Sequence, residues 1–452
     1  MQKKIAIVGA GLVGSLWAVY MAKRGYHVDV FDRRPDIRQL KIVQGKSINL
    51  ALSDRGWKGL EGAGIRTAIE KVALPMTGRL MHAVDGSLTY QPYGKDGQAI
   101  YSVSRGLLNQ TLMQCADEFP QVQLFFEHRC TDVNLKTNTI EFFDESKAQQ
   151  VSHTYDHIFG TDGAFSAVRS RLTKVDRYDF SQSYLDHGYK ELEIPAAGDG
   201  THQLRNDCLH IWPRGEFMMI ALPNVDGSFT CTLFIPFEGK NSLEHLTNPN
   251  AVRAFFEKHF PDAMALMPEL TDDFFANPNA SLVMTKCFPW HFQDKVCLMG
   301  DAAHAIVPFY GQGMNAGFED CTAMNRLLDE NGDDFDKVFA AFTSERKPCG
   351  DAILELALRN YIEMRDKTGD PVFLLQKKIE GRFSAKYPDR WIPLYSQVTF
   401  SHIPYHQALR NGDQQQKIMD SIMAIPNIDQ LWDSEMVEHQ MLELLQAQKS
   451  HS

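Results

Sequence analysis

Three glycines near the start of the chain most constrain its fold. Gly9, Gly11 and Gly14 follow an apolar run at 5–8 and precede a predicted helix at 15–24. In this setting the first glycine permits a tight turn, the second lets the backbone approach a pyrophosphate, and the third lets helix and strand pack closely. The anion would lie at the N-terminus of the helix. The motif predicts a strand-turn-helix unit that binds a dinucleotide.

An acid at the end of the next predicted strand supports this interpretation. The strand at 27–31 is followed by Asp32, where a carboxylate can accept hydrogen bonds from an adenosine ribose and disfavours a 2′-phosphate. One alternative is an ordinary glycine turn. Another is a secretory signal peptide, because Lys3 and Lys4 precede an apolar stretch. The three glycines interrupt that stretch and argue against secretion.

The composition indicates an intracellular enzyme. With 452 residues, of which 44% are hydrophobic and 23% charged, the chain can bury two or three cores. Its eight cysteines show no CxxC spacing, which predicts reduced thiols and neither a disulfide framework nor a zinc site. The formal net charge of −11 disfavours nonspecific nucleic-acid binding. We therefore expect no bound metal and no nucleic-acid partner.

Hydrophobic periodicity predicts an α/β fold with an α+β insertion. Residues 1–180 are expected to form the first part of a Rossmann-like domain, and 181–292 an inserted β-sheet substrate domain. Residues 293–375 supply the second part of the Rossmann-like domain and linking helices, and 376–452 a helical C-terminal region. No stretch of the tail approaches the ~20 apolar residues that cross a bilayer. We expect a cytoplasmic protein.

A second polar motif, far from the glycines in sequence, points to a flavin. Gly300 and Asp301 follow a buried strand at 295–299 and precede a helix. An extended FAD reaches far from its pyrophosphate, and its ribityl chain needs a second polar contact, which Asp301 is placed to provide. A simple helix N-cap is the alternative role for Asp301. Together the two motifs predict an FAD-binding domain.

The motifs resemble those of a known family. Gly9-x-Gly11-x-x-Gly14, Asp162-Gly163 and Gly300-Asp301 resemble the single-component FAD monooxygenases, the p-hydroxybenzoate hydroxylase-like family. More specific strings, extending to about residue 405, resemble its members that hydroxylate L-kynurenine. These strings lie at 45–52, 91–94, 187–192, 210–213, 308–315, 360–364 and 392–395.

The resemblance implies an activity. NADPH would reduce non-covalently bound FAD, O₂ would react with it, and a C4a-hydroperoxyflavin would convert L-kynurenine to 3-hydroxykynurenine in tryptophan catabolism. We assign no catalytic acid or base, because the cofactor carries the chemistry. A monooxygenase for another aromatic acid is the nearer alternative, and a non-catalytic flavin-bound redox sensor the remoter one. The partners are then small molecules, and a homodimer is left open.

Substrate contacts follow from the same resemblance and from side-chain chemistry. Arg79 matches a carboxylate in two-point geometry, and Tyr93 adds a phenolic donor. A solvated surface charge is the alternative for Arg79. Ile220, Leu222 and Phe234 are expected to form an apolar wall, with core packing as the alternative. The remaining predicted substrate residues are Asn360, Tyr395, Phe309, Gln312 and Met364.

The resemblance also places residues against FAD. These are Gly9, Gly11, Val13, Gly14, Phe31, Asp32, Arg33, Arg34, Ala51, Arg105, Cys130, Asp301, Met314 and Asn315. His304 is interpreted as structural. Two positions depart from the family pattern: Lys46 stands where many relatives have arginine, and Tyr310 stands in place of phenylalanine or histidine beside the flavin.

Overall fold

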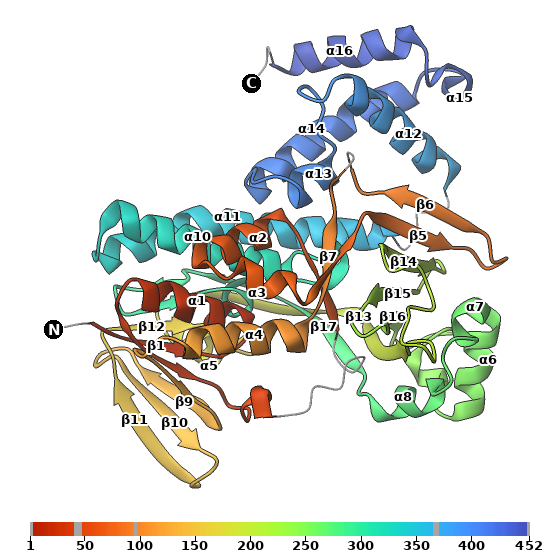
Figure 1. Ribbon diagram of the computed structural model, residues 1–452. Coiled ribbons are helices and arrows are strands. Elements are labelled where there is room, and N and C mark those ends of the chain that lie inside the picture. Colours follow the sequence, from red (N-terminus) through yellow and green to blue (C-terminus); the bar gives the residue numbers. More distant parts are fainter. Residues whose placement is uncertain (1–2, 40–47, 95–96, 365–369, 450–452) are drawn as a thin grey trace.

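A six-stranded sheet forms the centre of the molecule (Figure 1). Its strands are β1 (Lys4–Val8), β2 (His27–Phe31), β8 (Val122–Phe125), β12 (His157–Gly160), β18 (His291–Phe292) and β19 (Val296–Leu298). Their order is β18-β19-β12-β1-β2-β8, and all neighbours are parallel except β18 and β19. The computed structural model describes residues 3–39, 48–94, 97–364 and 370–449. This parallel arrangement confirms the predicted Rossmann-like domain.

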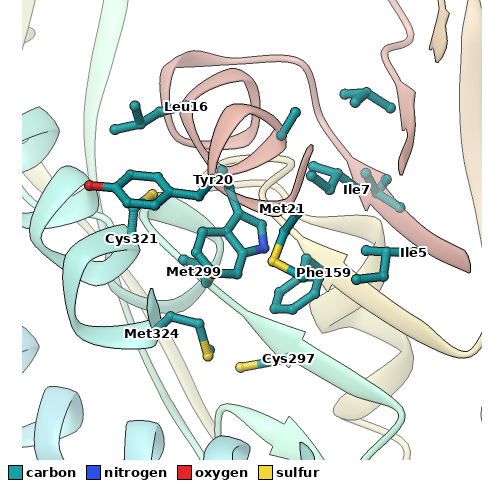
Figure 2. Close-up of a cluster of buried hydrophobic side chains, with 14 of the residues drawn as sticks. Ile5, Ile7, Leu16, Tyr20, Met21, Phe159, Cys297, Met299, Cys321 and Met324 are labelled. Carbon is teal, nitrogen blue, oxygen red and sulfur yellow. The ribbon is translucent and has the colours of Figure 1, made fainter. Parts of the chain in front are cut away.

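Helices α1 (Leu12–Lys23) and α10 (Gly313–Asn331) cover this sheet and bury its main core. Figure 2 shows Leu16, Tyr20 and Met21 of α1 packed above Phe159 of β12 and near Met324 of α10. Strand β1 is buried on both faces, which explains its uninterrupted apolar sequence. The core therefore fixes the turn that joins β1 to α1.

Two small sheets and several helices complete this domain. One sheet contains β9 (His128–Asn134), β10 (Thr139–Asp144) and β11 (Gln149–Thr154), and the other β3 (Asn49–Leu52), β4 (Ala73–Met76) and β7 (Ile100–Ser104). The helices are α2 (Asp54–Ala63), α3 (Arg66–Glu70), α4 (Arg105–Asp117) and α5 (Ala167–Leu172).

A seven-stranded sheet forms the second large layer. Its strands, in spatial order, are β17 (Ala280–Phe288), β13 (Asp179–Ile194), β16 (Phe229–Pro236), β15 (Met218–Pro223), β14 (Cys208–Pro213), β5 (Gly78–His82) and β6 (Leu88–Pro92). Strands β5 and β6 lie within residues 1–180, which the sequence analysis assigned to the first domain. β5 pairs in parallel with β14, so residues 78–92 belong to the substrate sheet by hydrogen bonding.

Helices also occur within residues 181–292, where the sequence analysis predicted a β-sheet domain. α6 (Pro249–His259), α7 (Pro261–Met264) and α8 (Leu270–Ala276) cover one face of the seven-stranded sheet. The apolar spacing of Val252, Phe255 and Phe256 gives α6 a single buried face. The insertion is therefore a sheet with a helical cover.

The remainder of the chain is helical, as predicted. It contains α9 (Asp301–His304), the short turn η3 (Pro308–Tyr310), α11 (Phe335–Ile362), α12 (Pro371–Lys386), α13 (Leu394–Thr399), α14 (Tyr405–Met423), α15 (Ile428–Leu431) and α16 (Glu435–Lys449). In Figure 1 the helices α12–α16 form a group above the β5–β6 hairpin, with α12 nearest to it. Within the described residues, no helix combines the length and apolar character required to span a membrane.

Candidate active site

The three glycine-containing motifs meet at one edge of the parallel sheet. The first follows β1, Asp162-Gly163 follows β12, and Gly300-Asp301 follows β19, and these three strands are neighbours. Parallel strands present their carboxyl ends at the same edge, where α/β proteins bind ligands. A Cβ atom on Gly9 would lie only 2.6 Å from the carbonyl oxygen of Thr161, so the first two motifs are in direct contact.

The glycine turn after β1 has the shape that a pyrophosphate requires. Gly9 has a φ of +104°, and a Cβ atom on Gly14 would lie 2.0 Å from the carbonyl oxygen of Gly9. In contrast, a Cβ atom on Gly11 would meet no atom within 4 Å. Gly11 is also the N-cap residue of α1 and provides no side-chain cap. Open space therefore faces uncapped N–H groups, which is a fit for a phosphate group.

Asp32 connects the glycine turn to Arg34. Its Oδ2 accepts hydrogen bonds from the Ala10 N–H at 3.0 Å and Arg34 Nη2 at 2.9 Å. Its Oδ1 accepts from the Arg34 N–H and Nε at 2.9 and 3.0 Å. These four bonds use the acceptor sites of the carboxylate. Because the Arg34 side chain is half exposed, it can turn away and release Asp32 for a ribose. Arg33, its neighbour, is exposed.

Phe31 is buried at the end of β2, and Cys130 lies on β9 near Asp162. The Phe31 ring stacks on Phe142 and Phe125, with ring centres 4.1 and 4.8 Å apart, and its carbonyl oxygen accepts from the Gly9 N–H at 2.7 Å. Cys130 is half-buried on β9, and burial raises the pKa of its thiol. Any contact of Phe31 with a nucleotide would therefore involve its backbone.

The Gly300-Asp301 motif is held by the first helix and by a buried ion cluster. A Cβ atom on Gly300 would lie 2.8 Å from Cγ2 of Val13, so α1 and this motif are tightly packed. The Gly300 N–H donates to Asp320 Oδ2 at 2.9 Å. Asp301 itself is exposed at the start of α9, directly after the carboxyl end of β19.

His304 belongs to the ion cluster below the motif. Its Nε2 lies 2.6 Å from Asp320 Oδ2, and Arg346 Nε donates to Asp320 Oδ1 at 2.8 Å. Burial raises the pKa of Asp320, but the charges of His304 and Arg346 outweigh this effect and hold it at about 2. These contacts support the structural interpretation of His304.

A turn between η3 and α10 is tied to β3 by Asn315. The Asn315 Nδ2 donates to the carbonyl oxygens of Ala51 and Gly311, both at 2.8 Å, and its Oδ1 accepts from the Ser53 N–H at 2.9 Å. Met314 is buried beside it. The structure therefore joins Ala51 and Asn315, and backbone groups engage the Asn315 amide; the predicted contacts of Ala51, Met314 and Asn315 with FAD stay a prediction. Arg105 is exposed at the start of α4.

Arg79 lies in an aromatic cluster built from three parts of the chain. Its Cζ is 5.3 Å from the ring centre of Tyr93 and 4.6 Å from that of Tyr395. The Tyr93 and Tyr395 rings stack with centres 5.5 Å apart, and Tyr310 stacks on Tyr395 at 5.7 Å. Tyr310 therefore extends the aromatic stack that supports the cation.

Two polar atoms in this cluster make no hydrogen bond of ordinary geometry among the described residues. Arg79 Nε and Tyr93 Oη are both buried, and the Tyr93 hydroxyl interacts with the Arg79 guanidinium without forming such a bond. Burial raises the pKa of Tyr93 well above its usual range, so the phenol remains a donor. Buried polar groups normally have partners, and leaving one unpaired costs about 1–3 kcal/mol. A ligand carboxylate would supply acceptors for both.

Aromatic and aliphatic side chains line the region beside Arg79. Phe234 and Phe309 have ring centres 4.9 Å apart and share a buried cluster with Met364. Leu222 packs in an adjoining cluster with Tyr93, and Ile220 contacts both clusters. The wall predicted from the sheet therefore continues into the helical region.

Asn360 and Gln312 hold the η3 turn in place. Asn360 Nδ2 donates to the carbonyl oxygen of Phe309 at 2.6 Å, and Gln312 Oε1 accepts from Tyr405 Oη at 2.9 Å. Sequence reasoning missed Tyr405, whose only signal was its place at the end of the family resemblance. Lys46 lies outside the described residues.

Comparisons with known proteins agree with this geometry. Residues 2–357 match the FAD binding domain family. Kynurenine 3-monooxygenase of Flavobacterium johnsoniae is 52% identical over 443 residues, which cover 98% of this chain and 99% of the relative. That of Flavobacterium psychrophilum is 51% identical over 447 residues, with 98% and 99% covered. The chain belongs to the kynurenine 3-monooxygenase family.

A solved structure shows the same fold. The tetrameric form of 2-methyl-3-hydroxypyridine-5-carboxylic acid oxygenase superposes with a TM-score of 0.66, covering 82% of this chain and 95% of that one. Its sequence identity is 17%, so the similarity concerns the fold alone. The kynurenine 3-monooxygenase family thus shares its architecture with oxygenases of distant sequence.

Proposed function

We propose that this chain is an FAD- and NADPH-dependent monooxygenase that hydroxylates L-kynurenine to 3-hydroxykynurenine. The observation that carries the proposal is a pair of buried donors, Arg79 Nε and Tyr93 Oη, which make no hydrogen bond of ordinary geometry among the described residues and lie beside an aromatic wall. L-Kynurenine has a carboxylate that could accept from these donors and an aryl ketone that could pack against the wall. The family membership and the FAD binding domain support the same conclusion.

The glycine turn and the two acidic motifs would hold FAD. The N–H groups at the start of α1, with the space beside Gly11, suit the pyrophosphate. Asp32 suits the adenosine ribose once Arg34 turns away, and Asp301 suits the ribityl chain. Bound FAD supplies the redox chemistry, accepting electrons from NADPH and activating O₂. The protein's task is to bind, orient and exclude water.

The substrate residues can be assigned roles from their chemistry. Arg79 and Tyr93 would bind the carboxylate by charge-assisted hydrogen bonds, and Tyr395 would support the Arg79 guanidinium from its other side. Phe234 and Phe309 would pack on the aryl ring and keep water out. Leu222, Ile220 and Met364 would complete the wall, and Asn360 and Gln312 would hold it.

Flavin reduction provides the decisive test. The purified protein should show a flavin spectrum, and its bleaching by NADPH without oxygen should accelerate when L-kynurenine is added. Aerobic turnover should then yield 3-hydroxykynurenine. Kynurenamine, which lacks the carboxylate, is the matched control and should bind far more weakly. If L-kynurenine has no effect on folded, flavin-loaded protein, the substrate assignment is wrong, and p-hydroxybenzoate and related acids become the candidates.

Cellular location and assembly are further proposals. We infer a cytoplasmic enzyme from the eight free cysteines, which suit a reducing compartment. We also propose a homodimer. Light scattering of the purified holoenzyme would test the second proposal, and a monomeric mass would contradict it.

A further inference from the structure

A hydrogen bond links the C-terminal helices to the turn that carries Phe309 and Asn315. Tyr405, the first residue of α14, donates from Oη to Gln312 Oε1 at 2.9 Å. Tyr405 is completely buried and Gln312 is 2% exposed, so water does not compete for this bond. Gln312 Nε2 has a longer contact, 3.5 Å, to Ser53 Oγ. The Tyr405 bond is therefore the stronger constraint on the Gln312 side chain.

Arg55 holds the Tyr405 ring in position. The Arg55 Cζ lies 4.1 Å from the Tyr405 ring centre. Its Nε donates to the carbonyl oxygen of Val398 at 2.8 Å, and its Nη2 donates to that of Ile403. These carbonyls belong to the chain immediately before Tyr405. Arg55, from α2, thereby docks the start of α14 against the flavin domain.

The charge of Arg55 is balanced inside the protein. Its Nη1 contacts Glu319 Oε1 at 2.5 Å, and Glu319 also accepts from Arg346. Burial raises the pKa of Glu319, but Arg346 and Arg55 outweigh this effect and lower it. Paired buried charges with several hydrogen bonds form a rigid support, because breaking one partner leaves the others uncompensated. Tyr405 therefore cannot swing away without disturbing this cluster.

Three contacts fix the turn between η3 and α10. Asn360 binds the Phe309 carbonyl oxygen, Asn315 binds Ala51 and Ser53, and Tyr405 binds Gln312. Asn360 belongs to α11, Ala51 and Ser53 belong to the flavin domain, and Tyr405 belongs to the C-terminal region. Without the Tyr405 hydroxyl, the Gln312 side chain would retain only its long contact to Ser53 among the described residues.

We propose that Tyr405 is a positioning residue for hydroxylation, because its hydroxyl fixes Gln312 and thereby the turn between the flavin and the aryl ring. This inference rests on the proposed function for its kinetic consequence. The structural part, that the hydroxyl restrains the turn, stands on the described contacts. The C-terminal helices then contribute to the reaction at two points, through Tyr395 over Arg79 and through Tyr405 at Gln312.

Tyr405→Phe in the FAD-loaded, full-length protein tests the proposal. Backbone hydrogen exchange at 311–317 should rise about fivefold, the factor expected from one neutral hydrogen bond. The kcat with L-kynurenine should fall by a similar factor, while KM changes less than about twofold because the carboxylate site is intact. Tyr387→Phe is the matched control, since it removes a hydroxyl that donates to Glu438 at 2.6 Å elsewhere in the C-terminal region.

A double variant identifies the bond as the cause. If Tyr405 acts through Gln312, the effects of Tyr405→Phe and Gln312→Leu should not add in the combined variant. Additive effects in the double variant would overturn the proposal. It would also be overturned if Tyr405→Phe had the hydrogen exchange and kcat of the wild type, or if exchange were faster while kcat was unchanged. If L-kynurenine does not accelerate flavin reduction in the wild-type protein, the proposed function fails. Unchanged hydrogen exchange at 311–317 in Tyr405→Phe would separately show that the Tyr405 hydroxyl does not restrain the turn.

Discussion

The guanidinium carbon of Arg79 lies 4.6 Å from the centre of the Tyr395 ring, although the two residues come from opposite ends of the chain. β5 carries Arg79 in the substrate sheet, and α13 carries Tyr395 in the C-terminal region. A cation over an aromatic face gains about 0.5–2 kcal/mol. The geometry of the predicted carboxylate site therefore depends on how the C-terminal helices dock.

Arg79→Met should abolish carboxylate recognition while leaving FAD bound. Methionine retains much of the side-chain volume but removes the charge, and a hydrogen bond to a charged group contributes about 1.5–3 kcal/mol. We expect the Kd for L-kynurenine to rise about 10- to 100-fold, measured by perturbation of the flavin spectrum. Arg205→Met is the control, because Arg205 also lies over a tyrosine, Tyr90, at 4.9 Å but is exposed. Equal effects of both substitutions would contradict the assignment.

Tyr93→Phe should separate ligand binding from stability. The Tyr93 hydroxyl is buried without a hydrogen bond of ordinary geometry among the described residues, so its removal should stabilise the folded protein by about 1 kcal/mol when no ligand is added. The same change should weaken L-kynurenine binding about fivefold, because the ligand carboxylate loses a donor. Thermal unfolding with and without L-kynurenine measures both effects. A lower melting temperature without ligand would show that the hydroxyl has a partner in the folded protein.

Gly11→Ala should impair FAD binding without impairing folding. An added Cβ atom would meet no protein atom within 4 Å, yet it would occupy the space predicted for the pyrophosphate. We expect native-like circular dichroism and at least about a tenfold loss of FAD affinity, a change of about 1.4 kcal/mol. Gly381→Ala on α12, where a Cβ atom is also unobstructed, is the control and should retain FAD. Normal flavin content in Gly11→Ala would place the pyrophosphate elsewhere.

Much of the Rossmann-like domain was predictable because its signals are local. The glycines, the run at 5–8 and Asp32 lie within one βαβ unit, and the strands at 27–31 and 296–298 form close to where the sequence predicted them. Strands β1 and β19 are continuous apolar runs, as is typical of buried parallel strands, whereas Asp29 interrupts β2. Such patterns do not depend on distant partners.

The pairing of β5 with β14 was not predictable, because its signal is not local. Residues 78–82 and 208–213 are far apart in sequence, and only tertiary packing joins them. Arg79 was selected by its chemistry and by family resemblance, but its contact with Tyr395 depends on docking of α13. Arg55 escaped notice because an arginine on a short helix has no sequence signal for burial, although it is 1% exposed. Roles that arise from such contacts require the structure.

Within the substrate sheet, a buried histidine pair on β5 and β14 gives a defined pH response. His210 Nδ1 lies 2.9 Å from His82 Nε2, and His210 Nε2 lies 2.8 Å from the carbonyl oxygen of Arg205. The carbonyl can only accept, so His210 donates from Nε2 and accepts at Nδ1. A second proton on His210 would then face the proton of His82. Burial lowers the pKa of His210 to about 4, and the His82 charge adds to this effect.

Acid should therefore destabilise the protein through His210. Its pKa in the folded state, about 4, lies below the unfolded value of 6.5, so the unfolded chain binds more protons between these pH values. The contribution of His210 to the free energy of unfolding is present above about pH 6.5 and is lost as the pH falls toward 4. At pH 5 the loss amounts to about 2 kcal/mol. Urea unfolding at pH 7.5 and pH 5 should show that His210→Gln loses less stability on acidification than wild type. His439→Gln, at an exposed site, should behave like wild type, and an identical pH response of all three proteins would show that His210 does not titrate in this range.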